Sequence, residues 1–396
     1  MGYSGKKSIE GMHVAVITDG ITPYVTGGMQ RHSFHLVKNL LLKGVKITLV
    51  HCVCGDDSFP SKDEVFSLFE TNAEQLEIHT LRFPSMQNVP GHYLRESYRY
   101  SCYIYELLKE RWGKFDFIYC KGFTSWCLLE QKKKGKHMAP VGVKFHGYEM
   151  FQKNKNIKGQ IEQYMLRPPV VFINRHADAV FSYGGEINAI IEKMGVDPEN
   201  IVSIGSGIDD SWLAPEPIAE QGKRRFLFIG RNEKRKGLDE LKALSGLVSK
   251  LPIEFHFIGP IPKLKQIKSS NCVYHGEIKD SRSLRNLIDN CQVLVAPSHS
   301  EGMPNVILEA MSRGLAVLST SVGAVPMMVS EKNGRLIPPQ DKSALSGALK
   351  ELANMDTAEL MKLRENSLNM VSEKYLWSSI SQKNLDAIEK ITFTLS

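Results

Sequence analysis

Short apolar segments alternate with helix-like segments along the whole chain, and this alternation constrains the fold more than any other feature of the sequence. Residues 13–20, HVAVITDG, have the nearly continuous apolar character of a buried strand. Residues 31–44 have the periodicity of an amphipathic helix ending at a glycine, and residues 45–53 form the next strand-like run. Further strand-like runs cover 115–122, 141–147 and 177–183. Such alternation predicts a parallel, doubly wound sheet.

The same alternation starts afresh in the second half of the chain. It begins with RRFLFIGR (224–231), directly after a turn-rich stretch. Later strand-like runs cover 253–259, 271–278, 293–298, 315–320 and 334–339. A chain of 396 residues is too long for one ordinary core and suits two domains of roughly 200 residues each. We therefore expect an α/β fold of two Rossmann-like lobes, with residues 1–205 in the first, 206–223 as a linker and 224–376 in the second.

Glycine-rich turns and charged residues gather at the predicted strand ends. Ligands of doubly wound sheets bind beyond the carboxyl ends of the strands, so we expect these turns to form the ligand-binding site. The turns are DGITPYVTGGMQ (19–30), HGYE (146–149), GRNEKRKG (230–237), HGEI (275–278) and SHSEGMPN (298–305).

The turn GRNEKRKG carries two cations suited to a diphosphate. Arg231 comes directly after a strand-like run, and Lys236 stands just before a predicted helix. A guanidinium and an ammonium so placed can both point at one anion, and the helix N-terminus adds N–H groups to the same place. The alternative is that Arg231 and Lys236 are ordinary surface charges that bind no ligand. We expect the neighbouring Lys234 and Arg235 to be solvated.

Two carboxylates, Glu301 and Glu309, accompany a second helix start. Pro304 suits the first position of a helix that continues to Arg313. The helix start leaves backbone N–H groups available to an anion, namely those of Met303, Asn305 and Val306. Carboxylates beside an anion site need hydroxyl groups to accept from, so the ligand must combine phosphates with sugar hydroxyls. A nucleotide sugar has both.

These motifs resemble those of a known family. EGMPNVILE resembles the E-x7-E signature of retaining glycosyltransferases with the GT-B fold, most closely family 4, and GRNEKRKG resembles the G-R-x4-K-G element of that family. The resemblance covers nearly the whole chain and includes ITPYVTGG, KFHG and the segment 177–209. It implies an acceptor-side first lobe, a donor-binding second lobe, and a C-terminal helix, 377–396, that packs back on the first lobe.

The resemblance also implies roles for individual residues. Arg231 and Lys236, after Gly230, would hold the diphosphate, Glu309 the ribose and Glu301 the transferred sugar. His146 would lie beside that sugar, and Glu277 and Ile278 along the base. The remaining implied donor-binding positions are Gly27, Gly28, Gly302, Met303, Pro304, Asn305 and Val306. Arg231, Lys236, Glu301 and His146 would be the catalytic residues.

The reaction that the resemblance implies is sugar transfer with retention of the anomeric configuration, without a metal or other cofactor. No D-x-D element is present, since GIDD (207–210) has the character of a turn. UDP-sugars are the favoured donors and GDP-mannose is the alternative, with a glycan, a lipid-linked precursor or a soluble small molecule as acceptor. A nucleotide-sugar 2-epimerase is a rival of different function. A nicotinamide dehydrogenase is not expected, because no G-x-G-x-x-G follows the first strand.

The charge distribution raises the question of a membrane surface. A net charge of +7 suits an acidic ligand or anionic lipid and falls short of a nucleic-acid binder. One stretch is rich in lysine, with Lys132, Lys133, Lys134, Lys136, Lys144, Lys153, Lys155 and Lys158 against Glu149 alone. These lysines form either a solvated face or, with the tyrosine-rich segment 91–112, a surface that rests on anionic lipid. Tyrosines packed on the first sheet are the alternative for that segment.

Several further features indicate the cellular compartment. The chain has no apolar run near the roughly 18 residues that a membrane span needs, and its first strand follows a short start without a signal-peptide pattern. The seven cysteines form no C-x-x-C pair, which favours reduced thiols over a disulfide or zinc framework. We therefore expect a cytoplasmic enzyme, with peripheral contact to the inner face of the membrane as the further hypothesis.

Overall fold

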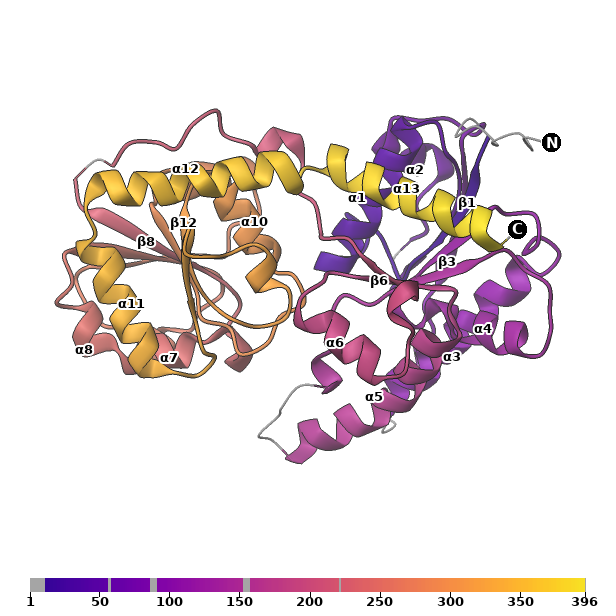
Figure 1. Cartoon of the computed structure of the whole chain (residues 1–396), viewed down its shortest axis with the longest axis horizontal. Helices are drawn as coiled ribbons and strands as arrows, with labels where there is room; N and C mark the ends of the chain where they lie inside the picture. The colour runs from indigo at the N-terminus through magenta and orange to yellow at the C-terminus, as the bar shows by residue number, and fades with distance from the viewer. Residues whose placement is uncertain (1–10, 56–57, 86–90, 152–156, 221, 396) are drawn as a thin grey trace. The chain divides into compact units, whose positions relative to one another are not determined.

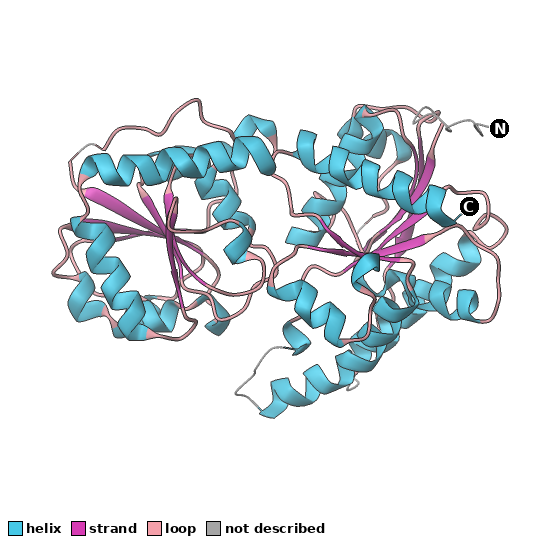
Figure 2. Ribbon diagram, in the orientation of Figure 1, coloured by secondary structure: helices cyan, strands magenta, loops and turns pink. Residues whose placement is uncertain are grey.

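The computed structural model describes residues 11–55, 58–85, 91–151, 157–220 and 222–395, which form two compact units (Figure 1). The first unit contains the chain up to Tyr183, residues 188–204 and the residues from Ile380 onward. The second contains residues 184–187 and 205–379. Each unit has its own parallel sheet with helices on both sides, as Figure 2 shows. The expected α/β architecture of two doubly wound lobes is confirmed.

The first unit is built on a seven-stranded parallel sheet in the order β3-β2-β1-β4-β5-β6-β7. The strands are β1 (His13–Ile17), β2 (Lys46–Val53), β3 (Leu76–Arg82), β4 (Phe117–Lys121), β5 (Val141–Lys144), β6 (Ala179–Ser182) and β7 (Ile201–Ser203). The central strands are mostly apolar because helices cover both of their faces. Val14, Val16, Leu49 and Ile118, for example, are completely buried.

The helices of the first unit alternate with these strands along the chain. They are α1 (Gly28–Leu42), α2 (Lys62–Phe69), α3 (His92–Leu107), α4 (Trp126–Lys133), α5 (Ile157–His176) and α6 (Glu186–Lys193). The last helix, α13 (Trp377–Leu395), returns to this unit from the far end of the sequence. Its residues Ile380 and Ile388 are buried, and Lys43 Nζ of the first unit donates to Gln382 Oε1 over 2.9 Å. The expected return of the C-terminal helix is thus observed.

The second unit repeats the topology with six strands in the order β10-β9-β8-β11-β12-β13. The strands are β8 (Arg224–Ile229), β9 (Ile253–Ile258), β10 (Cys272–Gly276), β11 (Val293–Ala296), β12 (Ala316–Thr320) and β13 (Gly334–Ile337). The helices are α7 (Leu238–Ala243), α8 (Ser245–Val248), α9 (Ser281–Asp289), α10 (Asn305–Met311), α11 (Lys342–Asn354) and α12 (Thr357–Lys374). Phe226, Phe255 and Phe257 lie in its core, at 0% exposure.

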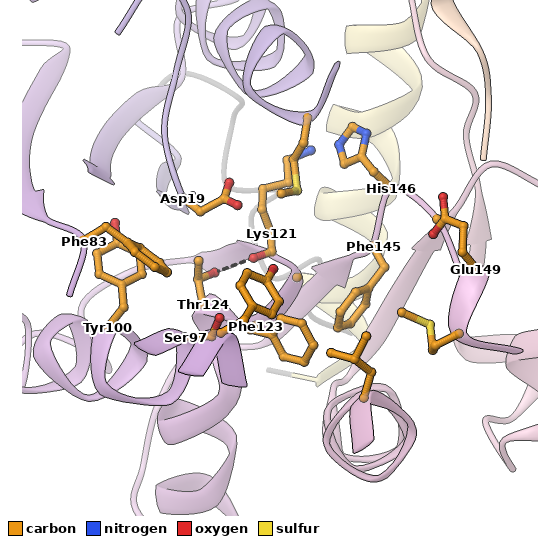
Figure 3. A pocket seen from close by; sticks show the side chains of 16 residues that line it. Asp19, Phe83, Ser97, Tyr100, Lys121, Phe123, Thr124, Phe145, His146 and Glu149 are labelled. Atoms are coloured by element: carbon orange, nitrogen blue, oxygen red, sulfur yellow. Dashed lines mark hydrogen bonds between the residues drawn. The ribbon is translucent and has the colours of Figure 1, made fainter. Parts of the chain in front are cut away.

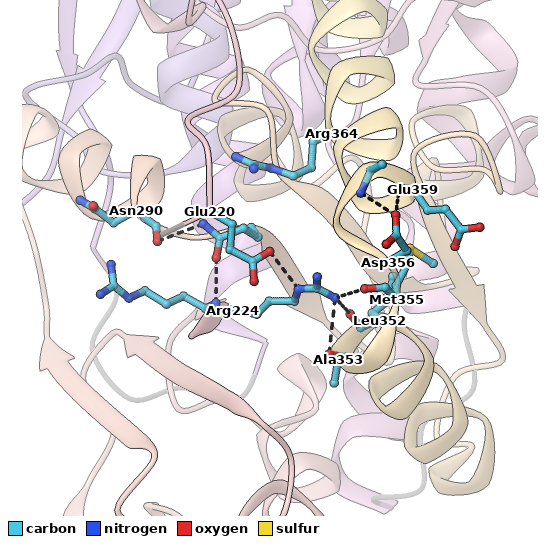
Figure 4. A network of polar contacts seen from close by, with 12 residues as sticks. Glu220, Arg224, Asn290, Leu352, Ala353, Met355, Asp356, Glu359 and Arg364 are labelled. Carbon is cyan, nitrogen blue, oxygen red and sulfur yellow. Dashed lines mark hydrogen bonds and ion pairs between the residues drawn. The ribbon is translucent and has the colours of Figure 1, made fainter. Parts of the chain in front are cut away.

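A buried arginine closes one end of the second unit. Arg224, at the start of β8, donates from NH1 to the carbonyls of Leu352 (2.7 Å) and Met355 (2.9 Å) near the end of α11, and its Nε lies 3.2 Å from Glu220 Oε2 (Figure 4). These bonds satisfy carbonyls that a helix end leaves without intrahelical partners. The segment 206–223 runs along the second unit, where Ala214 N donates to Ser312 O over 2.9 Å.

Candidate active site

Two loops of the second unit meet at the carboxyl ends of β8 and β11. Gly237 ends the turn that carries Arg231 and Lys236, and it has φ +74°. A Cβ atom at this position would lie 2.0 Å from Pro297 O, so only glycine lets the two loops approach so closely. A second close approach involves Gly323, where a Cβ atom would lie 2.1 Å from Glu301 O. The backbone therefore brings the Lys236 turn and the Glu301 turn together.

Glu301 is the centre of a polar cluster in these loops. Its side chain is only 9% exposed, and its Oε1 atom accepts from Lys236 Nζ at 2.6 Å and from Ser298 Oγ at 2.8 Å. Its Oε2 atom lies 3.3 Å from NH1 of Arg235. A buried carboxylate needs such partners, because an unpaired charge in the interior is costly. The structure thus brings Lys236 and Glu301, two of the predicted site residues, into direct contact.

Arg231 does not join this contact. Its side chain is 72% exposed, and its Nε atom lies 2.9 Å from Glu233 Oε1. The other oxygen of Glu233 lies 2.8 Å from Nε of Arg235, which in turn reaches Glu301. The expectation that Arg235 is simply solvated is wrong, because its place in a 3-10 turn beside Lys236 directs it to the same carboxylate. The sequence holds no clear signal for this contact, because the direction of a long side chain does not follow from its spacing.

The second predicted carboxylate lies on α10. Glu309 is 6% exposed and sits within the helix, whereas Glu301 precedes it. Helix α10 starts at Asn305 and not at Pro304, which is its N-cap, and it ends at Met311. The turn before the helix packs inward: Gly302, Met303 and Pro304 are buried, while Asn305 and Val306 are half-buried.

The predicted base-binding turn follows β10 at an edge of the second sheet. Glu277 is exposed and Ile278 half-buried. Next to Gly276 is a cavity of about 280 Å³, lined by Gly259, Pro260, Ile261, Pro262, Gln266, Tyr274 and Gly276. Gly230 N donates to Ile258 O over 3.0 Å, so the strand end that leads to Arg231 adjoins the strand end that leads to this cavity.

In the first unit, Gly27 and Gly28 form the start of α1, and His146, labelled in Figure 3, is the second residue after the end of β5. His146 Nδ1 lies 2.6 Å from the Tyr183 hydroxyl. Its Nε2 atom is buried and has no hydrogen-bond partner among the described residues. Burial, followed by the nearby Lys121 and Lys144, holds the pKa of His146 well below its usual range. The imidazole is therefore neutral near pH 7 and can offer only one N–H donor.

Two buried lysines lie at neighbouring strand ends of the first sheet. Lys121 Nζ, at the end of β4, lies 2.8 Å from His32 Nδ1, and Lys144 Nζ, at the end of β5, donates to Ile204 O over 2.9 Å. Both side chains are at most 1% exposed. Burial lowers the pKa of Lys144 to about 7 and lowers that of Lys121 well below its usual range.

The burial of Lys144 corrects the proposed surface of lysines, because a side chain with 0% exposure cannot contact a membrane. Lys132 forms an ion pair with Asp178. Lys133, Lys134 and Lys136 are exposed as expected. Lys153 and Lys155 lie outside the described residues, as does the side chain of Lys158.

Two parallel-sheet units that share the order of their first six strands, polar turns at the strand ends and a final helix that returns to the first unit together define the GT-B class of glycosyltransferases. Comparison with protein families agrees. The Glycosyltransferase Family 4 model matches residues 26–212, and the Glycosyl transferases group 1 model matches residues 223–355. The chain therefore belongs to the group 1 glycosyltransferases of the GT-B fold.

Individual relatives are distant. The WcaL protein of Escherichia coli K12, whose name assigns it to colanic acid biosynthesis as a glycosyltransferase, is 25% identical over 202 residues, which are 47% of this chain and 50% of that protein. The chain spans about half the length of the first curated relatives that it matches.

Solved structures extend the likeness to nearly the whole chain. Sucrose-phosphate synthase from Thermosynechococcus elongatus has a TM-score of 0.76 at 16% identity and covers 97% of this chain and 100% of its own. Anabaena HepE in complex with UDP has a TM-score of 0.68 at 14% identity and covers 96% of this chain and 100% of its own. At these identities the likeness concerns the fold alone.

Proposed function

We propose that this chain is a retaining glycosyltransferase that moves a sugar from a nucleoside-diphosphate sugar to a hydroxyl group of a glycan or lipid-linked acceptor in cell-surface polysaccharide synthesis. The observation that carries this proposal is the contact between Lys236 and the buried carboxylate of Glu301 at the strand ends of the second unit. The ammonium attracts a diphosphate and the carboxylate accepts from sugar hydroxyls. A ligand that carries both groups fits this pair.

The contact also suggests how the two halves of a donor are recognised together. When a diphosphate binds Lys236, Glu301 loses part of its hydrogen bonding to that ammonium. Leaving a buried acceptor unsatisfied costs about 1–3 kcal/mol, and more for a charged group. A sugar hydroxyl that donates to Glu301 removes this cost. Binding of the diphosphate thereby favours binding of the attached sugar.

The proposed chemistry needs no group beyond the two substrates and the protein. The bond between the anomeric carbon and the diphosphate oxygen breaks, and a bond to the acceptor oxygen forms on the same face. The acceptor proton passes to the departing phosphate oxygen. Lys236 and Arg231 would stabilise the negative charge that grows on the leaving group, which is the usual role of pre-placed cations. We assign no metal, no cofactor and no nucleic-acid partner.

UDP is the favoured nucleotide of the donor. HepE, which has the same fold, is described in complex with UDP, and the cavity beside Gly276, the residue that precedes Glu277, offers space for a base. The proposed role of Glu309 is to accept from the ribose hydroxyls. GDP-mannose is the alternative donor, and the relation to WcaL, which is named for colanic acid biosynthesis, supports a polysaccharide as the product class.

The test is to incubate the protein with a panel of UDP-sugars and GDP-mannose and to measure release of the nucleoside diphosphate. A transferase should release it slowly even without an acceptor and faster with one. A nucleotide-sugar 2-epimerase, the rival hypothesis, would show no faster release when sugar acceptors are added. Stabilisation by UDP or GDP in thermal unfolding would identify the nucleotide, since a ligand at 100 times its Kd adds about 2.7 kcal/mol.

Peripheral membrane association is part of the proposal. No helix in the described part of the chain is long and apolar enough to cross a membrane. The exposed Lys133, Lys134 and Lys136 remain available to anionic lipid, at about 1 kcal/mol each near the surface. Sedimentation with anionic and neutral vesicles tests this. Binding that is confined to anionic vesicles and lost at about 0.5 M salt supports membrane association. Failure to bind either kind of vesicle would mean that these lysines are ordinary solvent-exposed residues.

A further inference from the structure

The end of strand β10 contains an irregularity beside the cavity that we assign to the donor base. Strand β10 pairs with β9 in parallel, and the register shifts between Tyr274 and Gly276, so His275 is an extra residue in the strand. An extra residue of this kind bends the strand and re-aims a side chain, often next to an active site. Tyr274 and Gly276 both line the cavity, whereas His275 does not. The side chain of His275 is therefore available for another contact.

Tyr274 fastens the end of β10 to one face of the second sheet. Its ring stacks on Phe257 of β9, with centroids 4.6 Å apart and planes at 11°. Its hydroxyl oxygen accepts from Ile267 N over 2.7 Å. Phe257 is completely buried in the core of the second unit. On this face, the turn is therefore held by the packing of the core itself.

His275 fastens the same turn to the opposite face. Neighbouring residues of a strand point to opposite faces of a sheet, and His256 directly precedes Phe257 on β9. His275 meets His256 there, with Nε2 of His275 2.9 Å from Nδ1 of His256 and the two ring planes within 12° of each other. The side chain of His256 is only 14% exposed, so the hydrogen bond is largely shielded from water. Loss of either partner would leave the other poorly satisfied.

The surroundings of His256 determine which imidazole donates. Its Nε2 atom lies 3.6 Å from Oε2 of Glu254, and this carboxylate also lies 3.0 Å from Nε of Arg225. The carboxylate favours the tautomer of His256 that carries its proton on Nε2, which leaves Nδ1 as the acceptor. His275 then donates from Nε2. Burial holds the pKa of both histidines below its usual range, so near pH 7 two neutral rings complete the bond.

We propose that the hydrogen bond between His256 and His275 positions the turn after β10 for the donor base, so that both histidines are positioning residues for the transfer reaction. The inference rests on the proposed function, because it takes the cavity beside Gly276 as the base site. Neither imidazole touches the nucleotide. The bond holds Gly276 and Glu277 in place before the base arrives, so binding does not have to order the turn. Its loss should weaken recognition of the base and spare recognition of the diphosphate at Lys236.

Paired titrations of the full chain near pH 7 test this inference. UDP and GDP serve as nucleotides, and inorganic pyrophosphate probes the diphosphate contacts alone. His256→Leu and His275→Leu should each weaken binding of the preferred nucleotide by about threefold to tenfold, which is the equilibrium effect of one lost hydrogen bond. Pyrophosphate affinity should change by less than about twofold, because its proposed ligands lie on another turn. The double variant should lose no more than the weaker-binding single variant, since all three lack the same bond.

Conservative variants separate the hydrogen bond from the packing of the rings. The side-chain amide of Asn can take the place of Nδ1, and that of Gln the place of Nε2. His256→Asn and His275→Gln should therefore keep most of the nucleotide affinity. His79→Leu, which removes an imidazole from β3 of the first unit, is the control and should match the wild type.

Four outcomes would count against the proposals. Unchanged nucleotide affinity in both Leu variants would overturn the inference and leave the proposed function intact. Equal losses for the nucleotide and for pyrophosphate would also overturn the inference, because the damage would then extend to the whole donor site. Asn and Gln variants as weak as the Leu variants would show that the hydrogen bond is not what positions the turn. A wild type that binds neither nucleotide would instead contradict the proposed function, and the inference with it.

Discussion

Lys236 Nζ lies 2.6 Å from Glu301 Oε1, so the two residues assigned to different parts of the donor contact each other directly. Their loops come from different strand ends, and Gly237 permits the approach of one loop to the other. The pair therefore links the diphosphate and the sugar ends of the proposed donor site. Substitutions at this contact should separate binding from catalysis.

Removal of either side chain that is proposed to bind the diphosphate should slow the reaction. Lys236→Ala and Arg231→Ala should each lower kcat by about 10²-fold or more, because each cation stabilises charge that grows in the transition state. Initial rates at saturating nucleotide sugar measure this. Lys234→Ala, at an exposed position in the same turn, is the matched control and should keep full activity. Unchanged kcat in the first two variants would remove the diphosphate assignment.

Substitution of Glu309 and substitution of Glu301 should impair different steps of donor recognition. Glu309→Gln should weaken binding of the free nucleoside diphosphate, because its proposed partner is the ribose, which is present without a sugar. Glu301→Gln should retain that affinity and instead impair use of the intact donor. Calorimetric titration with UDP, beside kinetics with the nucleotide sugar, separates the two effects. Equal losses of both properties in both variants would contradict this division of roles.

The buried Lys144 should make stability depend on pH. Its pKa is lowered to about 7 from 10.5, so between these values the unfolded chain binds more protons there than the folded chain. The free energy of unfolding therefore rises with pH across this window, whereas below about pH 7 the full cost of burying the charge is present. Lys144→Met should lack this rise, which is on the order of a few kcal/mol.

Urea unfolding of the wild type and of Lys144→Met, from about pH 7 to pH 10, gives the comparison. Lys144 contributes to the lowered pKa of both Lys121 and His146, so the difference between the two profiles reports the buried charge of Lys144 together with its effect on these two neighbours. Lys136→Met, at an exposed position, should follow the wild type at every pH. Parallel profiles for the wild type and Lys144→Met would show that the ammonium is not suppressed by burial.

Removal of divalent metal should leave activity unchanged within about twofold. The proposed leaving group is neutralised by Lys236 and Arg231, and within the described residues no group of three or more His, Cys, Asp or Glu side chains is arranged to hold a metal ion. Rates before and after dialysis against a chelator, followed by addition of Mg²⁺ or Mn²⁺, provide the measurement. A loss restored by metal would assign part of the charge neutralisation to a cation.

Local pattern was enough to predict most of the strands and their parallel arrangement, because buried parallel strands are apolar on both faces. Strand β3, LEIHTLR, was not predicted: it is an edge strand with alternating polar residues, and its pattern is weaker than that of a central strand. The short β7, whose residues are only partly buried, was missed for the same reason.

The site was predicted less completely than the fold. Glu301 and Lys236 could be paired from strand-end turns, since such turns meet at one edge of a sheet. The contact of Arg235 with Glu301 depends on the direction of a long side chain, which spacing does not determine. The burial of Lys144 could not be predicted either, because a lysine after an apolar strand has the same local sequence whether later segments cover it or not.

The return of α13 to the first unit has a consequence for synthesis of the chain. The strands of the first sheet leave the ribosome before the second unit is made, but Leu385 and Ile388, which are buried in the first unit, emerge after it. At about 5–20 residues per second, the nascent first unit waits on the order of ten seconds or more for its final helix. During that interval the apolar surface that α13 covers is open to chaperones, and the first unit completes its core only when translation of its last helix is finished.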